Sequence, residues 1–207
     1  MDFGAYKHIE FRRKFWKLFG AEIAVSDATN QQLIGFIKMK AWQLKEDIRM
    51  YRDKSMSQEL FGIHARSVID FGAIYDVIDS TTGQPIFSLR RKGLRSTFVR
   101  DYWELFNPAG QQIGYIQETS STLALIRRYL EAIVEFAGLI FMFVPQTYEI
   151  NINTQDGGKT LVGQITHRKN PFIVKLSLDT TGAQITVDPR IAVAGTTMLA
   201  IVDASKG

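Results

Sequence analysis

The sequence predicts a mainly β protein in which a closed antiparallel barrel surrounds a buried hydrophobic C-terminal helix, with one additional amphipathic helix. Three observations predict this fold class. Short runs of alternating apolar and polar residues are joined by turn motifs, residues 120–137 have helical periodicity, and residues 191–202 contain no charged side chain.

The composition is that of a single globular domain spanning residues 1–207. Hydrophobic residues make up 45% of the chain and charged residues 22%, which is enough apolar surface for one sizeable core. The chain has no cysteine, so disulfides, thiol nucleophiles and thiolate metal sites are excluded. Charges are spread through residues 1–20, where a signal peptide needs an apolar run, so we expect a cytoplasmic protein.

Repeated hairpin motifs organise the chain. Residues 25–40 (VSDATNQQLIGFIKMK) and 77–92 (VIDSTTGQPIFSLRRK) share one pattern: Val, one residue, Asp, a polar turn, an apolar strand and a basic end. Related motifs occur at residues 105–118 (LFNPAGQQIGYIQE), at 176–188 (LSLDTTGAQITVD) and around Asp156-Gly157-Gly158. Asp or Asn followed by Gly is typical of tight turns, because the side chain accepts backbone hydrogen bonds and Gly adopts positive φ. Tightly joined short strands favour an antiparallel barrel or sandwich over a βαβ sheet.

The helical pattern at residues 120–137 interrupts the strands as an insertion. Its predicted apolar face contains Leu123, Ile126, Leu130, Ile133 and Val134, and its charged face contains Arg127, Glu131 and Glu135. Ser120 or Ser121 can cap the start of this helix, and Gly138 can end it.

A second helix is predicted at residues 189–203. Asp188 can act as its N-cap, and Pro189 suits its first turn. The uncharged residues 191–202 span about 18 Å at a rise of about 1.5 Å per residue, which is too short to cross a bilayer. A helix that is apolar on every side belongs inside a protein, and a sheet that closes around it supplies an apolar lining without exposed edges.

The order of these elements resembles the tubby C-terminal domain superfamily, of the phospholipid scramblase and LURP-one-related type. The resemblance extends from about Phe11 to Asp203 and rests on the motifs at residues 23–53, 75–92, 106–118 and 196–207. It implies a closed barrel of about 12 strands around the C-terminal helix. These motifs mark turns and core positions, so they indicate the fold more directly than the function.

The candidate binding site is a basic cluster that consists of Arg90, Arg91, Lys92, Arg95 and Arg100. No acidic residue occurs between Arg90 and Asp101. Such a cluster can bind phosphate-rich anions, in keeping with a net charge of +4 and a pI near 9.3. The alternative interpretation is a solvated strand and loop whose cations maintain solubility and protect an edge. Strand alternation predicts that Trp103 and Leu105 point into the core.

No catalytic, metal or cofactor site is predicted. His8, His64 and His167 lack the spacing of metal ligands or of a general base and are interpreted as surface or strand-end residues. The DTTG motif precedes a strand and is interpreted as a turn, not as a phosphate-binding loop.

Three functional hypotheses remain open. The first is a non-enzymatic binding or scaffold domain, cytoplasmic and peripheral to the membrane, that docks on an anionic membrane surface or phosphoinositide through the basic cluster. The second is a protein–protein interaction module that uses the helix at residues 120–137 as a partner or homodimer surface. The third, nucleic-acid association, is the weakest, because no helix-turn-helix, RRM or KH pattern occurs.

Overall fold

The computed structural model of the chain describes residues 2–16, 20–39, 47–66, 72–92, 102–119, 145–168, 174–182 and 187–202. This part of the chain contains a short 3₁₀ turn, 12 strands and one α-helix. In order, these are η1 (Phe3–Ala5), β1 (His8–Trp16), β2 (Gly20–Asp27), β3 (Leu33–Met39), β4 (Asp47–Tyr51), β5 (Glu59–Ala65), β6 (Ile74–Asp79), β7 (Pro85–Arg91), β8 (Tyr102–Phe106), β9 (Gln112–Glu118), β10 (Gln146–Asn153), β11 (Lys159–Arg168), β12 (Val174–Asp179) and α3 (Arg190–Val202).

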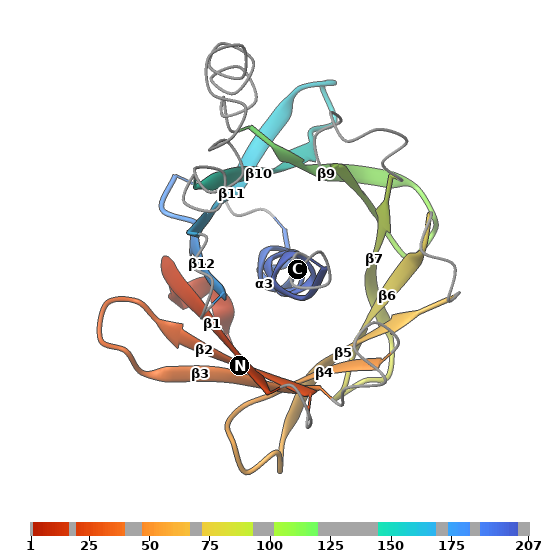
Figure 1. Cartoon of the computed structure of the whole chain (residues 1–207). Coiled ribbons are helices and arrows are strands. Elements are labelled where there is room, and N and C mark those ends of the chain that lie inside the picture. The colour runs from red at the N-terminus through yellow and green to blue at the C-terminus, as the bar shows by residue number, and fades with distance from the viewer. Residues whose placement is uncertain are drawn as a thin grey trace, which may run out of the picture.

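The strands form a closed antiparallel barrel. Each strand pairs with its neighbour in sequence, and β12 returns to pair with β1, so the described ring has no open edge. Figure 1 shows this ring with α3 near its centre. The predicted mainly β class, the closed antiparallel barrel and the C-terminal helix are thus confirmed. The amphipathic helix predicted at residues 120–137 lies outside the described residues, as does Asp203 at the predicted end of the C-terminal helix.

The hairpin turns are held by side chains that bind the backbone close by in sequence. Asp27 Oδ1 accepts a hydrogen bond from Thr29 N at 2.9 Å, and Asp79 Oδ1 accepts one from Thr81 N at 2.7 Å. Gly83 completes the second turn with a φ of 67°, which favours glycine. The predicted hairpins at residues 25–40, 77–92, 105–118 and around Asp156 are confirmed as β2–β3, β6–β7, β8–β9 and β10–β11.

The hairpin predicted at residues 176–188 is not formed by β12, and residues 183–186 of its second half lie outside the described residues. Asp179 does begin a turn, because Thr181 N donates to its Oδ1 at 2.8 Å. However, β12 already pairs with β11 on one side and with β1 on the other. Both edges of the strand are occupied, so it cannot pair with a returning third strand, and the chain continues to α3 instead.

Five hairpins, β2–β3, β4–β5, β6–β7, β8–β9 and β10–β11, each contain one extra residue on the second strand. These residues are all apolar: Ile34, Leu60, Ile86, Ile113 and Val162. A bulge of this kind increases the local twist and bends the strand that contains it. The repeated bulge therefore helps to curve the sheet into a ring.

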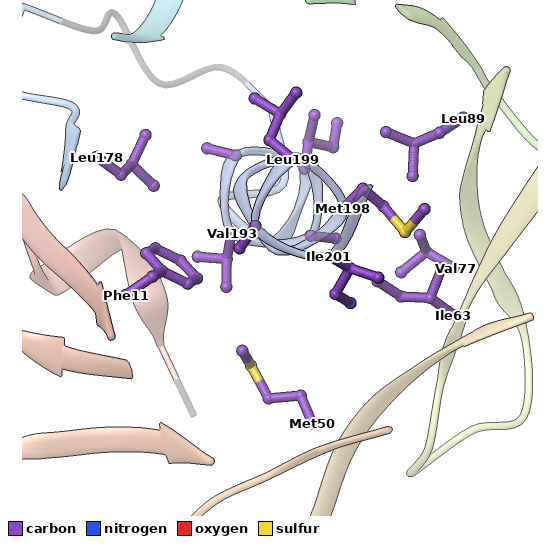
Figure 2. Close-up of a cluster of buried hydrophobic side chains, with 14 of the residues drawn as sticks. Phe11, Met50, Ile63, Val77, Leu89, Leu178, Val193, Met198, Leu199 and Ile201 are labelled. Atoms are coloured by element: carbon purple, nitrogen blue, oxygen red, sulfur yellow. The ribbon is translucent and has the colours of Figure 1, made fainter. Parts of the chain in front are cut away.

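The α3 helix supplies apolar side chains to the centre of the core. Among the residues from Ile191 to Ile201, no side chain is more than 5% exposed. Figure 2 shows Met198 directed toward Val77 and Leu89 on the facing wall. This arrangement fits the even distribution of apolar residues around the helix.

One glycine lets α3 pack closely against the barrel wall, and the two buried threonines of the helix have hydrogen-bond partners within it. A Cβ added at Gly195 would lie 2.5 Å from Ile116 Cδ1, so the backbone of the helix approaches β9 closely at this point. The buried Thr196 and Thr197 hydroxyls donate to carbonyl oxygens one turn earlier in the helix, at 2.8 and 2.9 Å.

Arg190 links the first turn of α3 to the hairpin turn after β6. Its guanidinium contacts Asp188 Oδ2 at 2.6 Å and also donates to Asp79. The hydrogen bonds from Arg190 lower the pKa of Asp79. Burial alone would raise the pKa of Asp188, but the bonds from Arg190 outweigh it and lower this pKa as well. The contact of Arg190 with Asp79 therefore fixes the start of the helix against the barrel.

Replacing Met198 by Ala should destabilise the fold by about 2–5 kcal/mol, because the substitution opens a cavity in a closely packed core. The matched control is Met56→Ala, since Met56 is 38% exposed and its replacement should change stability by about 0.5 kcal/mol or less. Urea denaturation measures the free energy of unfolding of both variants. Equal losses of unfolding free energy in the two variants would contradict the packing of Met198 in the core.

Replacing Arg190 by Gln should make the fold less sensitive to acid. The pKa values of Asp79 and Asp188 are lowered in the folded chain, whereas an aspartate in the unfolded chain has a pKa of about 3.9. Their stabilising contribution is therefore present above that pH and is lost as the pH falls through the lower folded-state pKa.

Urea denaturation at about pH 6 and about pH 3 should show a larger loss of unfolding free energy in the native chain than in Arg190→Gln. Lys54→Gln, in an exposed turn, is the control and should behave like the native chain. If Arg190→Gln showed the native pH dependence, the two ion pairs would not contribute to acid stability.

Candidate functional site

The basic cluster begins at the end of β7, where strand alternation divides its cations between the two sides of the barrel wall. Arg91 pairs in register with the buried Trp103, and its guanidinium lies 5.8 Å from the centre of the Trp103 ring. Arg90 and Lys92 alternate with Arg91 and lie on the outer side, where 42% and 69% of their side chains are exposed. The outer wall thus presents Arg90 and Lys92 to the solvent.

The predicted cluster is described only in part. Arg95 and Arg100 lie outside the described residues, so their membership of the cluster stays a prediction. The prediction that Trp103 and Leu105 point into the core is confirmed, because their exposures are 1% and 0%.

Glu104 holds Arg90 and Lys92 side by side. Its Oε2 lies 2.6 Å from Arg90 Nη2, and its Oε1 lies 3.3 Å from Lys92 Nζ. Glu104 is only 5% exposed. Burial alone would raise the pKa of Glu104, but hydrogen bonds from Arg90 and Lys92 outweigh it and hold the pKa below the ordinary value. The carboxylate is therefore ionised at neutral pH and positions both cations.

Aromatic rings lie beneath both exposed cations. The Arg90 guanidinium is 4.8 Å from the centre of the Phe106 ring, and Lys92 Nζ is 5.5 Å from the centre of the Tyr102 ring. Such cation–π contacts restrict the side chains while leaving hydrogen-bond donors toward the solvent. An anion that binds here would meet cations that are already ordered.

A second polar group, on the inner side of the wall, was missed by the sequence interpretation. Arg13, Glu118 and His167 are exposed by only 3%, 7% and 4%. They lie near the ends of β1, β9 and β11, which run in the same direction, so all three are at the same end of the barrel. His167, interpreted as a surface or strand-end residue, is next to the end of β11 but is buried, two residues after the buried Ile165. Strand alternation could have placed it inside.

Arg13 contributes directly to the C-terminal end of α3. Its Nη1 donates to Ala200 O at 3.1 Å and to Ile201 O at 3.5 Å. The last carbonyls of a helix have no partner within the helix, so a buried arginine at this point satisfies groups that would otherwise lose their hydration. The polar inner end of the barrel therefore has a structural role in holding α3.

The described residues offer little else that resembles a reaction site. A cavity of about 20 Å³ lies between η1 and the first turn of α3, lined in part by Phe3 and Pro189, and is large enough for about one water molecule. Within the described ranges, no three His, Asp or Glu side chains are grouped as metal ligands. No helix among them is both long enough and apolar enough to span a membrane.

Comparisons with protein-family models, with curated proteins and with solved structures found no match. The resemblance to the tubby superfamily therefore rests on the sequence motifs and stays a prediction.

Replacing Arg13 by Met should lower the free energy of unfolding by about 1–3 kcal/mol, because the substitution removes a buried donor from the carbonyls at the end of α3. The matched control is Lys14→Met, at the next position of β1, where the side chain is exposed and a change of about 0.5 kcal/mol or less is expected. Chemical denaturation of both variants measures the difference. Similar values for the two would show that Arg13 does not stabilise the helix end.

Proposed function

We propose that this chain is a non-enzymatic binding domain that docks on anionic phospholipid headgroups through Arg90, Lys92 and the basic connection that follows them. The proposal includes a cytoplasmic location, peripheral to the membrane, and membership of the tubby-like superfamily. Arg95 and Arg100 would extend the same surface, and Arg91 would support it from the inner side. No cofactor or metal takes part.

The observation that supports this proposal is the preorganised pair of cations over Glu104. Arg90 and Lys92 extend to the solvent, and aromatic rings lie beside their charged groups. Basic residues near an anionic surface contribute about 1 kcal/mol each, and aromatic residues with a polar edge are favoured at the headgroup level. Ordered cations beside aromatic rings fit a membrane-binding surface better than a purely solvated strand. In a solvated strand, the cations do not need to be held in place by a carboxylate and by aromatic rings.

For α3 we propose that the helix is a permanent part of the barrel core and not a releasable membrane segment. The low exposure of its side chains and the contact of Arg13 with its last turn support this role. Contact with the membrane is therefore assigned to the outer wall.

Flotation with lipid vesicles at low salt tests the lipid proposal. The native chain should float with vesicles that contain phosphatidylserine and not with vesicles of phosphatidylcholine alone, and about 0.5 M salt should weaken the binding. The triple variant Arg90→Gln/Lys92→Gln/Glu104→Gln removes both cations without leaving a buried carboxylate unpaired. Its affinity for the anionic vesicles should fall by about five-fold or more.

The control for net charge is Lys54→Gln, which lowers the net charge by one, as the triple variant does, but lies in an exposed turn after β4. This variant should bind like the native chain. Equal recovery of the native chain with neutral and anionic vesicles, or equal losses in the triple variant and in Lys54→Gln, would rule out docking through Arg90 and Lys92.

A further inference from the structure

A continuous line of four side chains begins at Lys92 and crosses the outer wall. Lys92 Nζ lies 5.5 Å from the centre of the Tyr102 ring, and Tyr102 stacks on Tyr115 with 5.5 Å between ring centres and 17° between ring planes. Lys159 Nζ in turn lies 5.0 Å from the centre of the Tyr115 ring. We refer to Lys92, Tyr102, Tyr115 and Lys159 as the ladder.

The ladder crosses the outer wall obliquely, from the end of β7 to the start of β11. Lys92 follows the last residue of β7, whereas Lys159 is the first residue of β11, a strand that runs in the same direction. The two lysines are therefore displaced along the strand direction as well as across the sheet. Between them lie four inter-strand spacings of about 4.8 Å, or about 19 Å around the wall.

We infer that the ladder is a membrane-contact surface and that the barrel lies on its side on an anionic bilayer, with the outer wall of β7–β11 toward the lipid. This inference rests on the proposed function and adds Tyr102, Tyr115 and Lys159 to the docking residues. The two lysines bind lipid phosphates at either end of the ladder, and the tyrosines occupy the headgroup level between them. Leu161, which is 38% exposed and lies in register with Asn151 beside Tyr115, provides an apolar contact on the same wall.

Single-stranded nucleic acid is a poorer match to the ladder. Bases bind to exposed aromatic residues by stacking on the faces of the rings. Here Tyr102 and Tyr115 cover one face of each other, and a lysine ammonium group lies over each ring. The ring faces are occupied, whereas the ammonium groups remain accessible to phosphates.

Flotation with phosphatidylserine vesicles tests the contribution of Lys159. Lys159→Gln should weaken the binding by about five-fold, whereas Lys54→Gln, with the same change in net charge, should leave it unchanged. The absence of cysteine from the chain allows a second test of orientation with single-cysteine variants. An environment-sensitive fluorophore on Leu161→Cys should shift to the blue with anionic vesicles, and the same fluorophore on Ser57→Cys, in the exposed turn after β4, should not.

The outcomes separate this inference from the proposed function. Binding that is weakened by the Arg90, Lys92 and Glu104 triple variant but not by Lys159→Gln, with no fluorophore shift at Leu161→Cys, would overturn the side-on orientation and leave the lipid proposal intact. A native chain that does not float with anionic vesicles overturns both. Binding of a labelled oligothymidylate in place of vesicles would also overturn both and indicate a nucleic-acid surface.

Discussion

The structure depends on filling the interior of a 12-strand ring. A barrel of about eight strands can be filled by its own side chains, but a wider ring leaves a central space. An α-helix is about 10–12 Å across with its side chains, and α3 occupies this space with apolar residues on every side. The ring and the helix therefore require each other: the inner faces of the strands need a partner, and the helix needs a lining that surrounds it.

Because the interior is filled, recognition is left to the outer wall and the two ends of the barrel. Among the described residues of the outer wall, Glu104 and Glu10 are nearly buried carboxylates that position cations. Glu104 binds Arg90 and Lys92, and Glu10 binds Arg12 at 2.5 Å and Lys175 at 2.6 Å. Aromatic rings lie beside the cations of Glu104, and the proposed docking on anionic lipid is based on this combination.

The sequence predicted the features that depend on neighbouring residues and missed those that depend on strand register. The turns at Asp27 and Asp79 are made by hydrogen bonds over two residues, and the absence of charge in α3 is visible in any short window. The hairpin predicted after β12 is not formed by that strand, because β1 occupies its free edge, which the turn motif does not reveal. The contact of Lys159 with Tyr115 follows from how distant strands align, which local patterns do not encode.

The order of the elements along the chain has a consequence for biosynthesis. A ribosome completes the strands in sequence, yet β1 must wait for β12, and the helix at the centre of the ring emerges after every strand. Until then the apolar inner face of the growing sheet has no partner, which exposes the nascent chain to aggregation. Closure of the ring therefore comes late, after β12 and α3 have been synthesised, and until then the partial barrel is a natural client for chaperones that shield apolar surfaces.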